Sequence, residues 1–473
     1  MNYKAILFFL GVNLLIVSVF SIFNILYSIY FDFFIDLNSY LITFVISFLL
    51  GFYLWYTGRR HNKDISLTDQ IGFIALCLFS VPLLISIPYF LSIYNINFVN
   101  SYFEAVSGFT TTGFSIIKST KNIDDPLILW RSSSQWMGGL FFLLAAIGTI
   151  GSKQAKIRPA YLISGGASGR NFYNNFNHNC IKILLIYLFS TILIIFLYNL
   201  AGIRLLDSFN LSFTTVSSGG FIPSNNLTSI INTDSQILAL SISLLLPIFN
   251  FFLLHDIITK KFSYRKNQED VHLASIIFFI TLFIYFFIIP QEGISNVFFA
   301  ITSSLSTSGI SVYSSSTDLS LFFILLTIIG GSLISTSSGF KYIRLYILFK
   351  ISYQEIYRLV KPINIIDKNL FNSESKIEDQ DVKIAFLVFI SFIISIFLLS
   401  SILSLDNLSF ESSFKLSIIT LTNTVNSSLY GLEDLSFFDL NILTKISLVL
   451  FMIIGKIEFI ALIYLIKRFI FRE

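Results

Sequence analysis

The sequence predicts an all-α integral membrane protein, and its composition, its hydropathy pattern and a recurring short segment support that class. Of 473 residues, 55% are hydrophobic and only 12% are charged, whereas about a quarter of the residues of a soluble domain are charged. The apolar residues gather in runs long enough to cross a hydrocarbon core about 30 Å thick, which takes about 20 residues of helix. Membrane lipid is therefore an expected partner of this surface.

Ten apolar segments are predicted to span the membrane. They are Ile6–Ile29, Tyr40–Tyr56, Ile71–Ser92, Leu127–Ile150, Ile181–Leu200, Ile237–Leu254, Leu273–Pro290, Leu319–Ile351 (broken), Val382–Leu403 and Leu440–Ile466. Lys4 is the only charged residue before the first segment, and no small-residue cleavage site follows the segment. We therefore expect a retained helix rather than a signal peptide.

Lysine and arginine concentrate in loops on one side of these spans, which the positive-inside rule assigns to the cytoplasm. The basic loops are Arg59–Lys63, Lys153–Lys182, Lys260–Lys266, Lys341–Lys383 and Lys467–Arg472. We therefore expect both termini to be cytoplasmic. The net charge of +4 follows from this topology and does not predict nucleic-acid binding. Acids on the opposite side, such as Asp36, Asp124 and Asp207, are expected to enrich cations near the outer surface.

Four shorter apolar stretches, of about 10 to 13 residues, fall between successive spans on the outer side and are too short to cross a bilayer. They suit helices that enter the membrane and turn back, namely Phe98–Gly108, Asp207–Val216, Ile294–Leu305 and Phe410–Leu421. A run of small residues follows each of them: Thr110–Phe114 (TTTGF), Ser217–Phe221 (SSGGF), Ser306–Ile310 (STSGI) and Thr422–Asn426 (TNTVN). One such run is ordinary helix-packing surface, but four in equivalent places indicate a repeated unit.

Three of the runs align on Gly113, Gly219 and Gly309. A phenylalanine precedes each aligned glycine by ten residues, at Phe103, Phe209 and Phe299. We expect these glycines to adopt φ > 0 and turn the backbone carbonyls toward a common axis. The fourth run has no glycine, so either Val425 or Asn426 takes that place. Asparagine tolerates φ > 0 better than valine does, which makes Asn426 the better substitute on physical grounds.

These segments predict a cation-selective pore. Irregular backbone is tolerated at membrane depth only where it is buried in protein or lines a water-filled cavity, and rings of carbonyls replace the hydration shell of K⁺ in potassium channels. Each short helix also directs its negative C-terminal end at the same place. The predicted filter residues are Thr111, Thr112, Gly113, Ser217, Ser218, Gly219, Thr307, Ser308, Gly309, Asn423, Thr424, Val425 and Asn426.

The chain therefore divides into two N-terminal helices and four units of membrane helix, pore segment and membrane helix around a pseudo-fourfold central pore. The predicted division is 1–63 for the two helices, then 64–170, 171–270, 271–376 and 377–473 for the four units. The filters lie at 110–114, 217–221, 306–310 and, in degenerate form, 422–426.

Two other classes of protein fit the sequence less well. A cation-coupled secondary transporter, driven by Na⁺ or H⁺, usually has one pair of related halves with breaks inside full-length helices, whereas the short segments here recur between helices. An enzyme is not predicted, because the spans contain no His, Asp and Glu cluster with metal-ligand spacing and no nucleophile beside a base. Glu104, in the first short helix, is interpreted as either an influence on the pore entrance or a hydrogen-bonded structural carboxylate.

Beyond the four filters, three motifs resemble the TrkH/KtrB superfamily of potassium transporters, and specifically its TrkH-type branch, the pore subunits of Trk potassium uptake systems. Trp130–Gly139 reads WRSSSQWMGG and is similar to the family's W-R-S-x-x-Q-W-x-G-G. Gly330–Lys341 reads GGSLISTSSGFK and is similar to a family segment in the third repeat. Gly455–Glu458 reads GKIE, where the family has G-R-x-E.

The resemblance covers nearly the whole chain and implies K⁺ as the transported ion, with no organic cofactor in this chain. It also implies a multi-pass protein of a bacterial inner membrane, a homodimer in which each protomer has its own pore, and a cytosolic nucleotide-binding regulatory subunit similar to TrkA.

Lys456 is predicted to be a gate. It lies within the last span, where a buried charge is costly and normally faces a cavity or a partner. We expect it below the filter, beside the small-residue loop that contains Gly330, Gly331, Ser335, Thr336 and Gly339. An ion pair with a carboxylate of another helix is the alternative. Because the gate is expected to be separate from the filter, Lys456→Ala is predicted to raise K⁺ flux without changing selectivity.

Overall fold

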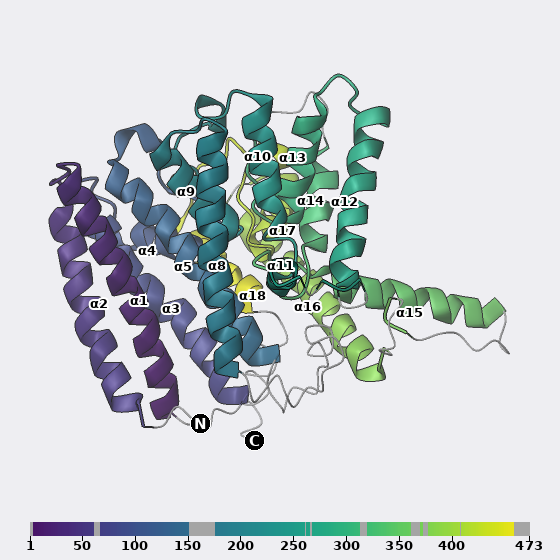
Figure 1. Ribbon diagram of the computed structural model, residues 1–473, viewed down its shortest axis with the longest axis horizontal. Coiled ribbons are helices and arrows are strands. Elements are labelled where there is room, and N and C mark those ends of the chain that lie inside the picture. The colour runs from purple at the N-terminus through teal and green to yellow at the C-terminus, as the bar shows by residue number, and fades with distance from the viewer. Residues whose placement is uncertain are drawn as a thin grey trace.

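The computed structural model describes residues 3–60, 67–150, 176–260, 262–264, 267–312, 319–360, 369–371, 377–406 and 408–457. Every regular element in these ranges is a helix. Figure 1 shows most of the long helices running roughly side by side, as in a membrane-spanning bundle. The predicted all-helical class is confirmed by this architecture.

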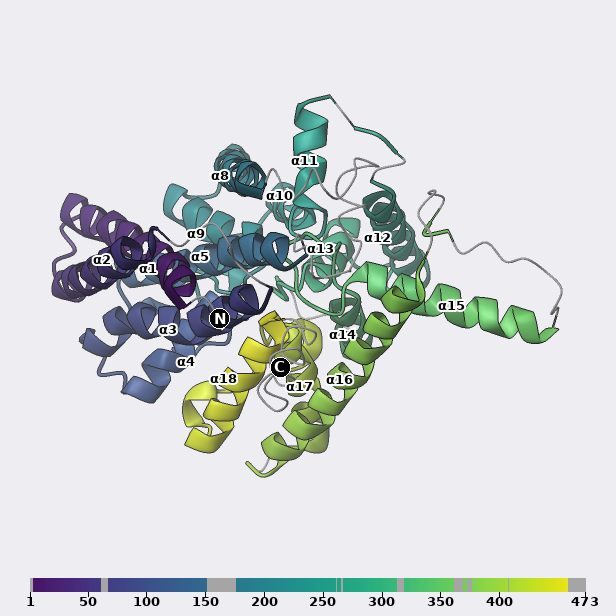
Figure 2. The ribbon, with the colours of Figure 1, turned by 90° about the horizontal axis from the view of Figure 1, so that it is seen from below.

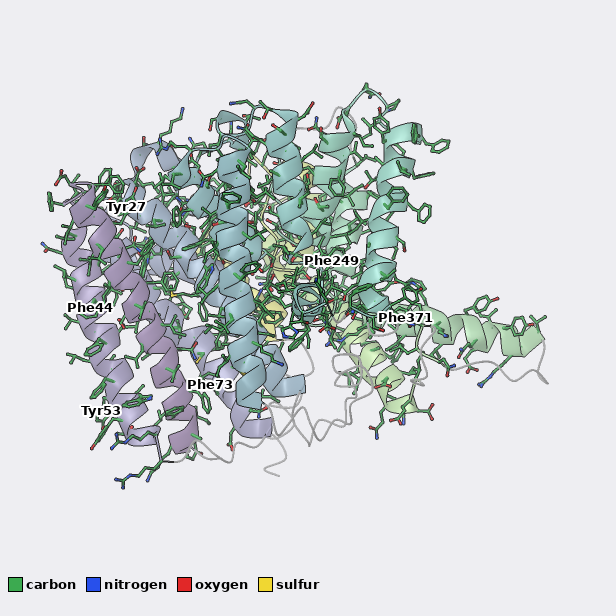
Figure 3. The ribbon with its side chains drawn as sticks, in the orientation of Figure 1. Tyr27, Phe44, Tyr53, Phe73, Phe249 and Phe371 are labelled. Atoms are coloured by element: carbon green, nitrogen blue, oxygen red, sulfur yellow. The ribbon has the colours of Figure 1, made fainter. Side chains whose placement is uncertain are left out.

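Helices α1 (Tyr3–Tyr30) and α2 (Leu37–Gly58) form a hairpin at one edge of the molecule (Figure 1). Glycines bring their backbones close together. A Cβ added at Gly11 would lie 2.5 Å from the backbone nitrogen of Trp55, and one added at Gly58 would lie 2.5 Å from the carbonyl oxygen of Lys4. The outer face of α2 is apolar and exposed, as the labelled Tyr53 illustrates (Figure 3). Such a face suits contact with lipid.

The remaining helices form four groups that surround a common centre when the molecule is seen from below (Figure 2). The first group is α3 (Leu67–Leu91), α4 (Phe98–Phe109) and α5 (Asp125–Ile150), and the second is α8 (Phe176–Leu200), α9 (Leu205–Val216), α10 (Asp234–Leu245) and α11 (Phe251–Ile258). The third group is α12 (Gln268–Phe287), α13 (Ile294–Leu305), α14 (Ser320–Ile329) and α15 (Tyr342–Val360), and the fourth is α16 (Asp379–Ser404), α17 (Phe410–Leu421) and α18 (Ile442–Ile457). Short 3₁₀ turns lie in the connections at Thr120–Asn122, Leu227–Ser229, Ser428–Tyr430 and Phe437–Asp439.

Six helices in the described part are long and apolar enough to cross a membrane: α1, α2, α3, α8, α12 and α16. Helices α10, α13 and α14 are apolar but shorter. Helix α5 carries the polar stretch Arg131–Gln135, and the predicted span Leu319–Ile351 is broken between Ile329 and Tyr342, as expected. The part of the predicted span Leu440–Ile466 beyond Ile457 lies outside the described residues.

The prediction of a continuous span over Ile237–Leu254 is wrong. Helix α10 ends at Leu245, and α11 begins at Phe251 after an irregular stretch. Pro247 in this stretch has no backbone N–H to continue the helix, and the side chain of Asn250 accepts a hydrogen bond from the backbone N–H of Phe252, which caps α11. The break also receives hydrogen bonds from the 330–341 loop, since the N–H groups of Ser332 and Ser337 donate to the carbonyls of Ile248 and Pro247.

Helix α15 does not continue the direction of α14. It projects sideways and away from the bundle in both ribbon views (Figures 1 and 2), so the second half of the predicted 319–351 span does not run parallel to the other long helices. Tyr346 of α15 stacks on Phe371 with ring centroids 4.2 Å apart, and Phe371 also lies 4.9 Å from the ring of His272 in α12 (Figure 3). These aromatic contacts fix the base of α15 against α12.

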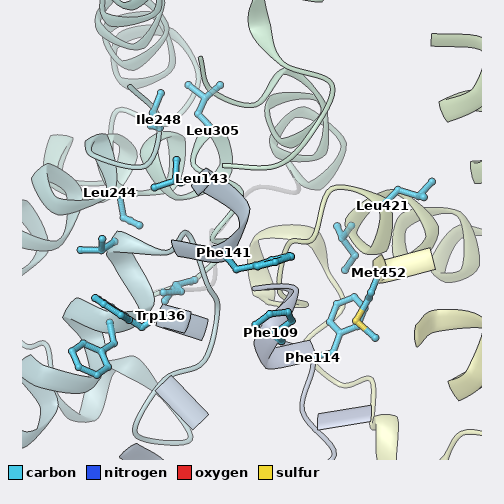
Figure 4. Close-up of a cluster of buried hydrophobic side chains, with 14 of the residues drawn as sticks. Phe109, Phe114, Trp136, Phe141, Leu143, Leu244, Ile248, Leu305, Leu421 and Met452 are labelled. Atoms are coloured by element: carbon cyan, nitrogen blue, oxygen red, sulfur yellow. The ribbon is translucent and has the colours of Figure 1, made fainter. Parts of the chain in front are cut away.

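The core surrounds the ends of the short helices. Phe109, Leu305 and Leu421 are the last residues of α4, α13 and α17, and all three are buried. Figure 4 shows them among the side chains of neighbouring helices, including Leu143 of α5 and Met452 of α18. Close packing of this kind holds side chains and backbone in one arrangement. It therefore positions the segments that follow the short helices.

Candidate functional site

Each short helix ends in the same way, which sets the register between the four segments that follow. The helices α4, α9, α13 and α17 each contain 12 residues and are followed by one capping residue. The next residue is left-handed in every segment, with φ of 60° at Thr111, 57° at Ser218, 59° at Thr307 and 50° at Asn423. The N–H of each also donates to the carbonyl three residues earlier. These four residues are therefore equivalent.

This register corrects the alignment made from the sequence. Gly113 corresponds to Gly220, Gly309 and Val425, whereas Gly219 corresponds to Thr112, Ser308 and Thr424. The predicted positive φ occurs at Gly113 (87°) and Gly309 (71°) but not at Gly219. Two consecutive glycines in the second segment conceal its register in the sequence. By the same register, the equivalent of Phe103 and Phe299 in the second short helix is Asn210 and not Phe209.

The four segments converge on one another. A Cβ added at Gly113 would lie 2.7 Å from the Cα of Gly220, and one added at Gly309 would lie 2.5 Å from Cγ2 of Thr424. The backbone N–H of Val425 donates to the carbonyl of Ser308 over 3.4 Å. The Ser308 hydroxyl donates to the carbonyl of Gly219. Residues from all four segments thus meet at the centre of the molecule.

Val425 is the residue of the fourth segment that is equivalent to Gly113, Gly220 and Gly309. A Cβ added at Gly220 would lie 2.3 Å from the Cβ of Val425, so the valine side chain fills the space beside that glycine. Asn426 lies one residue further on, and its Nδ2 donates to the carbonyl of Leu432 over 3.2 Å. The preference for Asn426 is therefore wrong. It rested on a need for φ > 0, and Val425 takes the position without adopting positive φ.

The chemistry of the convergent segments is uniform. None of the residues in 110–114, 217–221, 306–310 and 422–426 carries a charge. The polar side chains among the predicted filter residues are at most 1% exposed, apart from Asn426, and they are Thr111, Thr112, Ser217, Ser218, Thr307, Ser308, Asn423 and Thr424. Backbone carbonyls, hydroxyls and two amide side chains are thus the polar groups that these segments offer. Such oxygen ligands suit a dehydrated alkali cation.

A buried ion pair supports the first two segments from outside. The Nε of Arg131 lies 2.9 Å from Oε1 of Glu104, and Oε2 of Glu104 accepts a hydrogen bond from the N–H of Ile116 over 2.8 Å. The Arg131 guanidinium also lies 4.3 Å from the centroid of the Phe221 ring. One turn later on α5, Gln135 Oε1 accepts a hydrogen bond from the N–H of Phe221. Glu104 is therefore a hydrogen-bonded structural carboxylate, which was one of its two interpretations.

Lys456 of α18 lies directly beneath the first segment. Its Nζ is 2.7 Å from Oγ1 of Thr111 and 3.1 Å from Oγ of Ser338, and it lies 4.6 Å from the centroid of the Phe142 ring. The residue is only 3% exposed. Among the described residues, no carboxylate forms an ion pair with it. The ammonium therefore binds Thr111, one of the predicted filter residues, directly, although the sequence predicts a gate that is separate from the filter.

The loop between α14 and α15 lies beside Lys456 and contains the predicted residues Gly330, Gly331, Ser335, Thr336 and Gly339. Gly330 and Gly339 adopt φ of 64° and 82°. A Cβ on Gly330 would lie 2.4 Å from the Ser338 carbonyl oxygen, so the two ends of the loop touch. Gly331 is similarly close to the Ile248 carbonyl oxygen, at 2.4 Å. Neither glycine position has room for a side chain.

Sequence reasoning missed the residue that holds this loop together. The Nζ of Lys341 lies within the loop, 3.2 Å from the carbonyl of Ser332, 3.3 Å from that of Ser335 and 2.5 Å from that of Ser337. Lys341 is 1% exposed. Glu269 of α12 supports the same loop, since its Oε1 accepts a hydrogen bond from the N–H of Leu333 over 3.2 Å. The lysine at the end of the GGSLISTSSGFK segment is the sequence feature that could have indicated this role.

The outer acids offer less free negative charge than their number in the sequence suggests. Burial raises the pKa of Asp124 to about 6, with the neighbouring Asp36 carboxylate adding to the shift. Arg204 lies 3.9 Å from Asp125 and 3.8 Å from Asp207. Some of the expected attraction for cations is therefore cancelled locally.

Comparisons with known proteins find cation transporters among the relatives of this chain. No family model matches the chain. It is 27% identical to an uncharacterized cation transporter of Methanocaldococcus jannaschii, over 87% of this chain and 84% of the relative. It is also 27% identical to the Trk system potassium uptake protein TrkG of Escherichia coli, over 89% of this chain and 88% of the relative. The chain is 25% identical to TrkH of Vibrio parahaemolyticus, over 89% of each chain.

A solved structure has the same fold. The crystal structure of the potassium transporter TrkH from Vibrio parahaemolyticus superimposes with a TM-score of 0.85, covering 98% of this chain and 98% of that one at 22% sequence identity. The agreement extends over both the N-terminal hairpin and the four groups of helices, because nearly the whole chain is matched. It confirms the predicted fold class.

Proposed function

We propose that this chain, which belongs to the TrkH/TrkG family of potassium uptake proteins, takes up K⁺ through a filter formed by its four convergent segments. The observation that carries the proposal is their meeting at one place, where Gly113 touches Gly220 and Gly309 touches Thr424. An uncharged ring of carbonyl and hydroxyl oxygens favours a monovalent cation that gives up its water.

The proposed filter has four layers of equivalent residues in the register of the short helices. Working outward from the left-handed residues, the layers are Thr111, Ser218, Thr307 and Asn423, then Thr112, Gly219, Ser308 and Thr424, then Gly113, Gly220, Gly309 and Val425. The capping residues Thr110, Ser217, Ser306 and Thr422 form the layer on the helix side. K⁺ is the proposed substrate, and this mechanism requires no organic cofactor.

The proposed gate consists of Lys456 and the 330–341 loop. A fixed ammonium next to Thr111 repels a cation that leaves the filter on that side. The loop lies beside the ammonium, and its Ser338 hydroxyl accepts a hydrogen bond from it. Opening therefore requires the loop to move away together with α18, and Gly330 and Gly339 provide backbone freedom at its two ends.

The wider assembly is also a proposal. By analogy with Trk systems, we infer a homodimer with one pore per protomer, a cytosolic regulatory subunit similar to TrkA, and cytoplasmic termini in a bacterial inner membrane. The division of the chain into 1–63, 64–170, 171–270, 271–376 and 377–473 assigns one filter segment to each of the last four parts. The basic loops support this orientation.

Complementation tests the function directly. Expression in a bacterial host that lacks its own potassium uptake is expected to restore growth at low external K⁺, with candidate regulatory subunits supplied in parallel. Gly113→Ala is expected to abolish the rescue, because its Cβ would strike Gly220. Gly293→Ala, which meets only an ordinary contact at 3.4 Å, is the matched control and is expected to retain it.

Proteoliposomes separate the pore from a coupled carrier. Rb⁺ uptake driven by a K⁺ gradient alone, without a Na⁺ or pH gradient, is expected for a pore. A folded, membrane-inserted protein that moves neither K⁺ nor Rb⁺ with any candidate regulator would disprove the proposed function.

A further inference from the structure

Three of the four left-handed residues at the base of the proposed filter are an unusual choice for that conformation, and only Asn423 is of a type that tolerates it well. Glycine would adopt φ near 55° without cost, yet the positions hold Thr111, Ser218, Thr307 and Asn423. A β-branched residue is a genuine outlier at positive φ. Strained conformations of this kind persist only where the surrounding structure holds them. The contacts of these side chains therefore show what does the holding.

All four side chains bind elements of the proposed gate. Oγ1 of Thr111 accepts a hydrogen bond from Lys456 over 2.7 Å, and Oγ1 of Thr307 accepts one from the backbone N–H of Ser338 over 2.9 Å. The Ser218 hydroxyl donates to the carbonyl of Thr336 over 2.8 Å. Nδ2 of Asn423 donates to the carbonyl of Met452 over 2.9 Å, one turn before Lys456 on α18. Two bonds reach the loop, and two reach α18.

The residues immediately before them behave differently. They are the capping residues Thr110, Ser217, Ser306 and Thr422. The hydroxyl of each donates to a backbone carbonyl of its own short helix. A bond to the nearest helix carbonyl is the ordinary arrangement for such residues. Of the side chains at these two positions, only those at the left-handed position bond to the loop or to α18. These bonds are thus a property of that position and not of hydroxyl residues in general.

We propose that Thr111, Ser218, Thr307 and Asn423, the coupling ring, connect the gate to the filter, so that the position of the gate sets ion selectivity. The proposal rests on K⁺ uptake through this filter. When the loop and α18 move, the ring loses the hydrogen bonds that hold its strained backbone. The backbone of each ring residue then relaxes, and the carbonyls of the adjoining filter residues shift. These ring residues are positioning residues for the filter.

A double-mutant cycle on one bond tests the coupling. Purified protein in liposomes is compared for K⁺ and Na⁺ permeability in four forms: wild type, Lys456→Met, Thr111→Val and the double variant. Both single variants remove the bond between Lys456 and Thr111. Each is expected to lower the K⁺/Na⁺ permeability ratio roughly tenfold, the size expected for one hydrogen bond to a charged group. The double variant is expected to lower the ratio by less than the product of the two single effects, because the bond between Lys456 and Thr111 can be lost only once.

Three control variants distinguish the bond from general damage. Thr111→Ser and Lys456→Arg keep an acceptor and a donor, and they are expected to keep the wild-type ratio. Thr281→Val removes a buried hydroxyl that bonds only within α12, and it is also expected to leave the ratio unchanged. If Lys456→Met fails to fold, Thr307→Val tests the same coupling through the backbone of Ser338.

The outcomes separate this proposal from the proposed function. Normal K⁺ flux with an unchanged ratio in Lys456→Met would overturn the coupling while leaving K⁺ uptake intact. Additive effects in the double variant would overturn it as well. Absence of K⁺ flux in every form, including wild type with its regulator, would instead refute the function itself.

Discussion

At the scale of single residues, the layer of the proposed filter that contains Gly113, Gly220 and Gly309 departs from fourfold symmetry at one position. Three positions of this glycine layer are glycine, and the fourth is Val425, whose side chain packs against Gly220. The isopropyl group both fills space in the ring and stiffens the backbone that carries it. The fourth segment is therefore the one least able to follow the other three in adjusting to an ion.

We predict that Val425→Gly sharpens selectivity for K⁺ over Na⁺ by a few-fold, since four equivalent carbonyl rows fit the ion more evenly than three. The measurement is the ratio of Rb⁺ to Na⁺ uptake in proteoliposomes. Asn426→Gly is the matched control, because Asn426 binds the Leu432 carbonyl outside the ring. A change in Asn426→Gly without one in Val425→Gly would contradict the register.

At the scale of elements, two helix breaks support each other. The stretch between α10 and α11 accepts hydrogen bonds from the 330–341 loop at Pro247 and Ile248, and the N–H of Phe251 donates to the carbonyl of Ile334. Asp270 of α12 accepts a further bond from the N–H of Asn250 over 2.9 Å. Non-helical backbone at this depth must find such partners inside the protein. The breaks in the second and third groups thus form one unit below the filter.

We predict that deletion of Leu333–Ser335 raises K⁺ flux in the absence of the regulator by roughly tenfold or more, because a shortened loop cannot reach both the α10–α11 break and Lys456. Rb⁺ uptake into vesicles without regulator gives the readout. Elution of the purified variant as a single species serves as the folding control. Basal flux equal to or below that of wild type in a well-folded deletion variant would show that the loop does not obstruct the path.

At the scale of the whole molecule, the N-terminal hairpin is attached to the outside of the first group. The ring centroid of Phe20 in α1 lies 5.2 Å from that of Trp136 in α5, and the ring centroid of Tyr40 in α2 lies 5.9 Å from that of Trp130. These rings connect the hairpin to the helix that carries Arg131 and Gln135. The hairpin does not contribute a residue to the filter segments. It packs against α5 from outside the four groups.

We predict that Gly11→Leu lowers the thermal stability of the purified protein but leaves its K⁺/Na⁺ ratio unchanged. The new side chain would collide with the α2 backbone near Trp55, and overpacking of this kind costs about 1–3 kcal/mol. Thermal unfolding in detergent measures the loss. Leu26→Ala, at a position 61% exposed on α1, is the control with little expected effect. A changed ion ratio in Gly11→Leu would show that the hairpin acts on the filter.

The membrane class, the long spans and the four short segments with their small polar residues could be predicted without coordinates, because hydropathy and residue size are local properties. Lys456 could be identified in the same way, since a charge within an apolar run is visible in the sequence. The register of Gly219 and Gly220, the place of Val425 and the break before α11 became clear only from the folded chain. These depend on where helices end and on which backbone groups meet across segments, and such contacts join residues more than a hundred positions apart, as in the bond from Ser218 to Thr336.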